Sequence, residues 1–250
     1  MADFRSILIT GASSGLGEAL AMEYASPGVT LFLSGRDAAR VEAVAAACRA
    51  KGAVAEGKVI DATDRAAMAA WIAACDAQAP LDLVIANAGV AGISEGHAGT
   101  VEAEAYRVLP VNIDGVVNTV IPALDPMRKR KHGQIAIMSS LASFRGFGRS
   151  PAYGASKAAV RVWGEGLRLR VARDKVGVTV ICPGFVRSRM TAGNTFPMPF
   201  LMGSDHAAKI MRRGLDANRA RISYPWPMVM LVWLLAALPP AWTDPFLGNR

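Results

Sequence analysis

The sequence predicts an α/β protein built on a doubly wound, mostly parallel sheet of about seven strands, with helices on both faces. Two observations predict this class. Short runs rich in Ile, Val and Leu recur without polar alternation, as strands buried on both faces do. An Ala-rich helical stretch follows nearly every run, and this alternation produces right-handed strand–helix–strand units. With 250 residues, 52% of them hydrophobic, the chain is long enough for one such domain and too apolar for a disordered chain.

The expected elements alternate from the N-terminus onward. Six runs have the pattern of buried strands, and a less regular seventh follows them: Ser6–Thr10, Val29–Ser34, Ala53–Ile60, Leu81–Ala86, Gln134–Met138, Val176–Cys182 and Arg219–Tyr224. The expected helices are Leu16–Ala25, Ala38–Ala50, Arg65–Ala77, Val111–Arg130, Pro151–Arg173 and Asp205–Asn218. Ser150 and Pro151 are typical of an N-cap and a first helical position. No repeat or linker divides the chain, so residues 1–250 are expected to form one domain.

A glycine-rich turn, Thr10–Gly17, lies between the first strand and the first helix. Gly11 permits a tight turn, Gly15 lets the backbone approach a diphosphate, and Gly17 allows the helix to pack closely on the sheet. The N-terminus of that helix offers free N–H groups and a partial positive charge to phosphate. The spacing is GxxxGxG, and glycines also serve ordinary turns. The position directly after the first strand nevertheless predicts the dinucleotide site of a Rossmann fold.

The second strand ends in the sequence Ser34-Gly35-Arg36-Asp37. A site for NAD usually places a carboxylate at this strand end, where it binds the ribose 2′-hydroxyl. Here Gly35 occupies that place, and the guanidinium of Arg36 can bind a 2′-phosphate through two parallel hydrogen bonds. NADP is therefore the expected cofactor, with NADPH preferred over NADH. The alternative is that Arg36 only caps a loop and Asp37 binds the ribose.

Tyr153 and Lys157 lie four residues apart and share one face of the expected helix. A phenol with an ordinary pKa of about 10 is a weak acid–base group at neutral pH. A nearby ammonium group and a cationic nicotinamide are expected to lower the pKa of Tyr153. Taken alone, this spacing fits a solvated pair of side chains better than a catalytic one.

Further motifs occur in register with these, and together the chain resembles the short-chain dehydrogenase/reductase family along nearly its whole length. The matching segments are Thr10–Gly17, Asp61, Asn87-Ala88-Gly89, Asn112, Ser139-Ser140, Tyr153 with Lys157, and Pro183-Gly184. The resemblance implies that Ser140 hydrogen-bonds a substrate carbonyl, Tyr153 donates the proton during reduction, and Lys157 binds the nicotinamide ribose. It also implies that Asn112 supports the water through which Lys157 exchanges protons.

The resemblance implies a cofactor site spread over several turns. Asp61 is the expected adenine contact, Asn87 begins the supporting turn after the fourth strand, and Ser188 stands where threonine is more usual in the family. The full expected set is Gly11, Ser13, Ser14, Gly15, Leu16, Gly17, Arg36, Asp61, Ala62, Asn87, Ala88, Gly89, Tyr153, Lys157, Pro183, Gly184, Val186 and Ser188. A homodimer or homotetramer, joined through the Val111 and Pro151 helices, is also implied.

These features predict an oxidoreductase that transfers hydride between NADP(H) and a carbonyl or secondary alcohol. Residues 187–218 correspond to the family's substrate loop and helix, and the loop is strongly apolar, so an apolar or amphipathic substrate is expected. The alternative is that the loop simply packs as a lid. Two other functions stay open: a 3-oxoacyl reductase, and a non-catalytic NADP-binding regulatory protein on the same fold.

The sequence gives no indication of a disulfide, a metal site or a nucleic-acid-binding surface. Cys48, Cys75 and Cys182 lie far apart, which indicates reduced thiols in a cytoplasmic protein rather than disulfides. The three histidines are scattered, so no metal site is expected; His97 belongs to a loop where it is either solvated or touches substrate. The net charge of +8 suits an anionic cofactor, substrate or membrane surface. The basic run at 128–131 ends a helix, and without interleaved aromatic residues it does not indicate nucleic-acid binding.

The apolar C-terminal tail, 225–250, is the unusual segment. No residue from Ile222 to Thr243 is charged, but prolines on both sides confine an uninterrupted helix to Met228–Leu238. About eleven residues span roughly 16 Å, half of a hydrocarbon core of about 30 Å. A helix that is apolar all round is expected to bury its whole circumference. Three burial sites are open: a subunit interface, the substrate cleft, or peripheral contact with a membrane.

Overall fold

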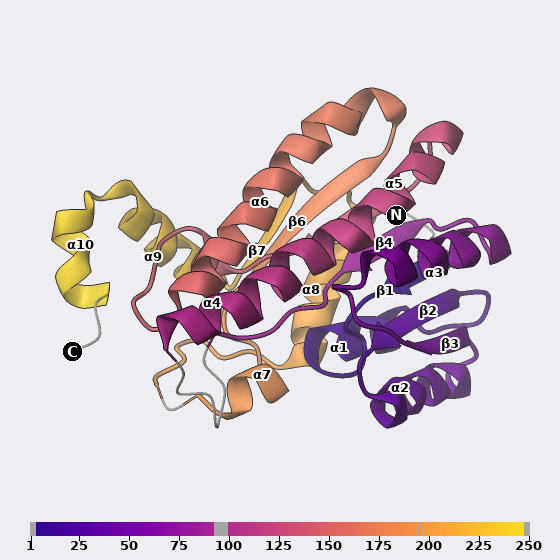
Figure 1. The fold of residues 1–250 in the computed structure, drawn as a ribbon, viewed down its shortest axis with the longest axis horizontal. Helices are drawn as coiled ribbons and strands as arrows, with labels where there is room; N and C mark the ends of the chain where they lie inside the picture. The colour runs from indigo at the N-terminus through magenta and orange to yellow at the C-terminus, as the bar shows by residue number, and fades with distance from the viewer. Residues whose placement is uncertain (1–3, 93–99, 195, 248–250) are drawn as a thin grey trace.

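The computed structural model describes residues 4–92, 100–194 and 196–247. Seven strands form one sheet: β1 (Ser6–Ile9), β2 (Thr30–Gly35), β3 (Val54–Val59), β4 (Leu83–Ala86), β5 (Gln134–Met138), β6 (Gly177–Pro183) and β7 (Arg221–Tyr224). The α-helices are α1 (Gly15–Tyr24), α2 (Ala38–Ala50), α3 (Arg65–Gln78), α4 (Val101–Leu109), α5 (Gly115–Arg130), α6 (Pro151–Val171), α7 (Arg189–Ala192), α8 (Ser204–Asp216), α9 (Trp226–Ala237) and α10 (Pro240–Leu247). Figure 1 shows their arrangement.

The sheet is parallel throughout and has the order β3-β2-β1-β4-β5-β6-β7. Side chains alternate between its faces, so Ile7 and Ile9 pack with α1, α2 and α8, while Leu8 packs with α3, α5 and α6. Two buried clusters therefore lie on opposite sides of one sheet. The doubly wound Rossmann fold expected from the sequence is confirmed.

The strand order reverses between β1 and β4, and this reversal places the site. From β1 the chain winds outward to β3, then returns to β4 on the other side of β1. The loops that leave the carboxyl ends of β1 and β4 diverge, which opens a crevice at this edge of the sheet. The glycine turn after β1 and Asn87 after β4 both lie there.

The third strand differs from the expectation of a buried strand, and that expectation is wrong. β3 is an edge strand in which Ala55 is buried, whereas Val54 and Val59 are 57% and 53% exposed. α2 packs against one face of β3 and leaves the other face to solvent. An apolar run does not reveal whether its strand lies at the centre or at the edge of a sheet.

A helix that the sequence did not predict, α4, precedes the expected Val111 helix. Thr100 caps α4, because its side chain accepts a hydrogen bond from the backbone N–H of Ala103. The chain then passes through one π-helical segment, Pro110–Asp114, and continues directly into α5. Proline at 110 marks a helix start by sequence rules, yet here it lies inside a continuous helical path.

The tail folds as two short helices, α9 and α10, which project from one end of the molecule (Figure 1). α9 buries Met228 and Val232 against Leu141, Val180 and Cys182. Most of the other apolar side chains of α9 are exposed in the single chain, so the burial of its whole circumference by a second subunit or a membrane stays a prediction. Among the residues that the structure describes, no helix is long and apolar enough to cross a membrane.

Candidate active site

The glycine turn packs tightly against the end of β4. Gly11 and Gly15 have φ angles of +66° and +62°, a conformation that other residues rarely adopt. A Cβ atom on Gly11 would lie 2.8 Å from Cα of Ala88, and one on Gly17 would overlap the carbonyl oxygen of Gly11. Each of these glycines is therefore required by a close approach or by backbone conformation.

Asn87 fastens the turn to the sheet. Its Nδ2 donates hydrogen bonds to the carbonyl oxygens of Thr10 and Gly11, at 2.9 and 3.1 Å. In return, the hydroxyl of Thr10 accepts from the backbone N–H groups of Asn87 and Ala88, at 3.1 and 3.2 Å. These bonds fix the turn relative to β4 and hold the start of α1 at the crevice.

A pocket of about 390 Å³ lies beside the turn. Ser188 closes one side of the turn, since a Cβ on Gly15 would lie 3.1 Å from its Cβ. The lining residues come from the turn, α1, α2 and the segment after β6: Ser13, Ser14, Gly15, Glu18, Arg40, Ala43, Val44, Arg187, Ser188, Arg189 and Ser204. Three arginines and the N-terminus of α1 give this pocket the character of an anion site.

Arg40 and Arg187 were not singled out from the sequence. Arg40 follows Arg36 by four residues in the sequence, but the surface of a helix commonly carries an arginine. Arg187 is adjacent to Ser188, and only the fold brings it to α2. No local signal in the sequence distinguishes either arginine from a solvated side chain.

The end of β2 is arranged around Asp37. Its carboxylate caps α2 by accepting a hydrogen bond from the N–H of Arg40 at 3.1 Å, and it pairs with the Arg40 guanidinium at 2.9 Å. Arg36 next to it is exposed. Gly35 leaves no room for a side chain, because a Cβ there would lie 2.7 Å from Cγ2 of Val41 and 2.9 Å from Oγ of Ser13.

Asp61 and Ala62 follow β3 at the same edge of the sheet. The backbone N–H of Thr63 donates to Asp61, and this bond is the main cause that holds the pKa of the Asp61 carboxyl below its usual value; the positive charge of Arg36 acts in the same direction. Ala62 is buried, and its carbonyl accepts a hydrogen bond from Asn118 at 3.0 Å.

Tyr153 and Lys157 project from the first turns of α6 toward the carboxyl end of β5. Nζ of Lys157 lies 5.8 Å from the centre of the Tyr153 ring and donates to the carbonyl of Met138 at 3.0 Å. The hydroxyl of Ser140 lies close enough to the phenol of Tyr153 to lower the pKa of that phenol. The three side chains expected to act together therefore meet at one place.

Burial is the largest cause of the pKa shifts of Lys157 and Tyr153. It lowers the pKa of Lys157 to about 8, since among the described residues no carboxylate pairs with this amine. It raises the pKa of Tyr153 above its ordinary value, and the nearby hydroxyl of Ser140 only partly opposes this rise. The expected lowering of the Tyr153 pKa is therefore not found in the protein alone. Loss of water around the phenol is the main cause of the raised pKa, and the amine of Lys157 donates its hydrogen bond to the carbonyl of Met138 instead.

Asn112 lies in the π-helical segment and forms hydrogen bonds with the loop after β4 and with α6. Its Oδ1 accepts from the N–H of Val90 at 2.8 Å, and its Nδ2 donates to the carbonyl of Val90 at 3.1 Å and to Oγ of Ser156 at 3.0 Å. A Cβ on Gly89 would lie 3.1 Å from Oδ1 of Asn112 and 3.3 Å from Nζ of Lys157. The loop after β4 therefore lies directly against the amine.

The segment after β6 completes the rim. Oγ of Ser140 donates a long hydrogen bond, 3.5 Å, to the carbonyl of Pro183, and the N–H of Gly184 donates to the carbonyl of Tyr224 at 2.7 Å. Val186 is buried and pairs with Met202 across the expected substrate loop. His97 lies outside the described residues.

The residues at this edge fit a pyridine dinucleotide. The glycine turn leaves the start of α1 open to a diphosphate, and a Cβ on Gly11 or Gly17 would remove the close contacts that position it. At the other end of the site, Lys157 is an amine that has no carboxylate partner among the described residues. Within the described ranges, no three side chains of the usual metal-binding types are grouped closely enough to hold a metal ion.

Comparisons with known proteins agree with this geometry. The short chain dehydrogenase family model matches residues 5–196. An uncharacterized oxidoreductase of Myxococcus xanthus is 40% identical over 238 residues, which are 94% of this chain and 93% of that protein. Another from Mycobacterium tuberculosis is 32% identical, with 97% of each chain covered. A short-chain dehydrogenase from Sphingobium yanoikuyae, solved in complex with NADPH, is 25% identical with a TM-score of 0.79 and covers 95% of this chain and 97% of its own.

The chain belongs to the short-chain dehydrogenase/reductase family and is an oxidoreductase of that family.

Proposed function

We propose that this protein transfers hydride between NADP(H) and a carbonyl or secondary alcohol. The observation that carries the proposal is the meeting of the Ser140 and Tyr153 hydroxyls beside the buried amine of Lys157. When bound, the nicotinamide cofactor supplies or accepts the hydride. The protein's own contribution is to orient the carbonyl and to provide hydrogen-bond donors where alkoxide charge develops.

Each side chain has a distinct task in this proposal. Ser140 and Tyr153 hydrogen-bond the substrate oxygen, and Tyr153 gives its proton to that oxygen during reduction. Its raised pKa keeps the phenol protonated at neutral pH, which suits a proton donor. Lys157 binds the nicotinamide ribose, and Asn112 holds the loop after β4 against the amine and supports proton exchange with water.

The preference for NADP rests on the residues around the end of β2. The carboxylate of Asp37 caps α2 and forms an ion pair with Arg40. The side chain of Arg36 is exposed to solvent. A 2′-phosphate suits this cluster of guanidinium groups better than an uncharged ribose hydroxyl does. The NADPH complex of the Sphingobium yanoikuyae relative supports the same choice.

Arg36→Ala tests the cofactor assignment. The variant should raise the Kd for NADPH by roughly 30- to 100-fold, because two charge-assisted hydrogen bonds are lost, and change the Kd for NADH little. Fluorescence titration with each nucleotide measures both constants, and Arg170→Ala, an exposed arginine at the far end of α6, is the matched control. An equal loss of affinity for the two nucleotides would show that Arg36 does not bind the 2′-phosphate.

An apolar or amphipathic carbonyl compound is the proposed substrate. The segment 187–203 presents Met190, Phe196 and Phe200 near the site, and the ring of Phe196 packs edge-on against Phe185 at 5.9 Å. Rates of NADPH oxidation with long-chain ketones, a 3-oxoacyl thioester and small polar ketones distinguish the candidates. Activity on polar ketones alone contradicts an apolar substrate, and a thioester-specific rate favours a 3-oxoacyl reductase. NADPH binding without turnover on any compound favours a regulatory protein.

We also propose a cellular location and an oligomeric state for the enzyme. Residues 1–250 work as one domain in the cytoplasm, which suits three buried free thiols. A homodimer or homotetramer joins through α5 and α6, where Ile121, Val162 and Leu169 are exposed apolar side chains. Sedimentation velocity of the purified chain measures the assembly.

A further inference from the structure

The surface of α9 and the start of α10 is strongly apolar. α9 contains no charged residue, and only Met228 and Val232 are buried beneath it. Its exposed large side chains, together with that of α10, are Trp226 (76%), Met230 (60%), Leu231 (46%), Trp233 (50%), Leu234 (59%) and Trp242 (67%). Single exposed apolar residues are ordinary, but six on two consecutive helices mark an interaction surface.

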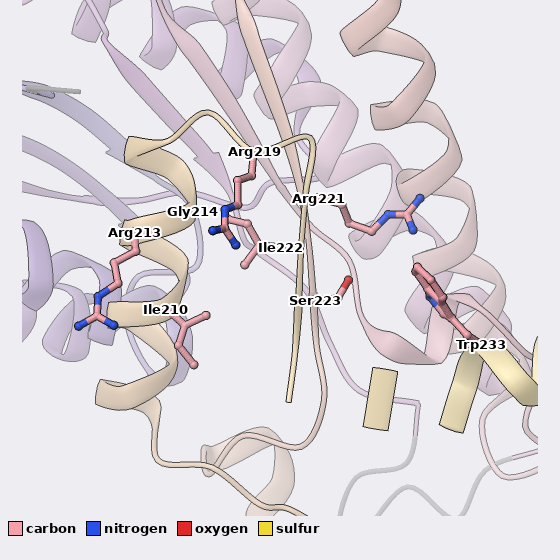
Figure 2. A pocket seen from close by; sticks show the side chains of 8 residues that line it. All are labelled: Ile210, Arg213, Gly214, Arg219, Arg221, Ile222, Ser223 and Trp233. Carbon is pink, nitrogen blue, oxygen red and sulfur yellow. The ribbon is translucent and has the colours of Figure 1, made fainter. Parts of the chain in front are cut away.

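A basic pocket of about 570 Å³ adjoins this surface (Figure 2). It runs along the outer edge of β7 between α8 and α9, and its lining residues are Ile210, Arg213, Gly214, Arg219, Arg221, Ile222, Ser223 and Trp233. Figure 2 shows Arg213 and Arg219 on one side of Ile222, with Arg221 and Trp233 on the other. The pocket thus joins cationic side chains to the apolar helix.

The charge of this pocket is only partly compensated. Arg221 pairs with Glu165 at 2.6 Å, whereas Arg213 and Arg219 have no carboxylate partner among the described residues. Nε of Arg221 and the hydroxyl of Ser223 are buried without a hydrogen-bond partner in the described part of the chain. A ligand with anionic oxygens would satisfy both groups.

We propose that α9, the start of α10 and the basic pocket form a docking surface for a membrane with anionic phospholipids. The tryptophans and leucines enter the interfacial region, where amphipathic aromatic rings are favoured, and the arginines bind headgroup phosphates. α9 has 12 residues and is about 18 Å long, so it lies in the interface and does not span the bilayer.

Charge favours a lipid surface over a second copy of this chain. The molecule carries a net charge of +8, and a two-fold contact through this face would place the arginines of both copies in one interface. An anionic bilayer provides the opposite charge over the whole face. On such a bilayer, the apolar residues and the arginines both favour binding.

Docking here would hold the loop that follows Ser140 close to the bilayer. Met228 and Val232 of α9 pack on Leu141, the residue after Ser140. Arg145 lies in the same loop, before α6. It donates to Oγ1 of Thr243 at 2.9 Å and pairs with Asp244 at 2.7 Å, and both bonds hold α10 against this loop. Membrane binding itself does not depend on the proposed enzymatic function; only a route for substrate from the bilayer rests on that function.

Vesicle flotation of the full-length protein tests the proposal. The probes are vesicles of phosphatidylcholine with and without phosphatidylglycerol. Two double variants remove the two parts of the surface: Trp226→Gln with Leu234→Gln, and Arg213→Gln with Arg219→Gln. Val54→Gln with Lys58→Gln is the matched control, because both side chains are exposed on β3. Thermal melting checks folding, and sedimentation velocity without lipid records the oligomeric state.

Wild-type protein and the β3 control should float with anionic vesicles and much less with neutral ones. The arginine variant should bind anionic vesicles roughly 25-fold more weakly, because each arginine near an anionic surface contributes about a fivefold factor. The Trp226 and Leu234 variant should lose flotation. Failure of wild-type protein to float, or equal flotation of all variants, overturns the proposal. A variant that becomes monomeric while wild-type protein ignores lipid shows a subunit interface instead.

A measurement on wild-type protein alone keeps the proposal testable if the variants do not fold. Brominated lipid in the anionic vesicles should quench the tryptophan fluorescence, since Trp226, Trp233 and Trp242 lie on the docking surface. Unchanged fluorescence at saturating lipid overturns the proposal. Because this readout needs no cofactor or substrate, its failure is distinct from a failure of the proposed enzymatic function.

Discussion

The amine of Lys157 is buried, and among the described residues its hydrogen-bond acceptor is the carbonyl of Met138 rather than a carboxylate. An ammonium group in this position loses hydration without gaining an ion pair, so its pKa falls to about 8. This arrangement is poor for stability and suits a site that binds ribose hydroxyls. Residues at functional sites commonly break the rules of a stable core in this way.

The depressed pKa of Lys157 makes stability depend on pH. Below about pH 8 the amine is protonated in both states, and the folded protein carries the full penalty of burying the charge. Between pH 8 and 10.5 the unfolded chain binds more protons than the folded one, so the free energy of unfolding contributed by this group rises with pH. The rise amounts to about 3 kcal/mol over that window.

Lys157→Met should remove this contribution. In urea unfolding, the variant should be more stable than wild-type protein at neutral pH, and the difference should shrink as pH rises toward 10.5. The comparison cancels other groups that titrate in the same range, because both proteins share them. Parallel stability curves for the two proteins would contradict a depressed pKa at Lys157.

At the scale of elements, the π-helical segment between α4 and α5 positions Asn112. Proline has no backbone N–H, so an α-helix through Pro110 lacks one hydrogen bond. The chain forms a wider, π-helical turn at this point, in which the N–H of Gly115 donates to the carbonyl of Pro110. Segments of this kind occur often at functional sites. Here the buried side-chain amide of Asn112 bonds to the loop after β4 and to Ser156 of α6.

Asn112→Ala should weaken both stability and catalysis. The N–H of Val90 loses its acceptor, which costs roughly 1–3 kcal/mol of unfolding free energy. The loop bearing Gly89 then shifts against Lys157, so kcat should fall by at least about tenfold, in the range of lost positioning effects. Steady-state kinetics and thermal unfolding measure the two effects.

Gln134→Ala is the matched control for Asn112→Ala. It also removes a buried amide, one that donates to Thr179 at 2.9 Å at the start of β5, away from the carboxyl edge of the sheet. This control should lose similar stability and keep its kcat. Equal loss of kcat in both variants would mean that Asn112 acts only through general stability.

At the scale of the whole molecule, the sequence predicted the class of fold and the edge of the sheet that carries the site. It did so because short strands buried on both faces and a glycine turn after the first strand have local signatures. The meeting of Ser140, Tyr153 and Lys157 was implied by resemblance, and the geometry brings them together.

Other features depend on tertiary packing and had no local signature. The exposure of β3 depends on its place at the edge of the sheet, and that of α9 on what packs beside it. Arg40 and Arg187 become neighbours only because α2 and the segment after β6 lie together. The pKa of Tyr153 is raised mainly by burial, and burial cannot be inferred from a spacing of four residues.

Tyr153→Phe tests the central claim most directly, and Tyr106→Phe, an exposed tyrosine on α4, is its control. NADPH affinity is titrated by fluorescence, and hydride transfer is followed by NADPH absorbance with a ketone that wild-type protein reduces. Loss of the phenolic hydroxyl should lower kcat by about 100- to 10,000-fold, the usual contribution of a positioned proton donor. NADPH affinity should stay within about twofold, because Lys157 and the glycine turn are intact. Turnover close to that of wild-type protein would contradict the claim that Tyr153 donates the proton.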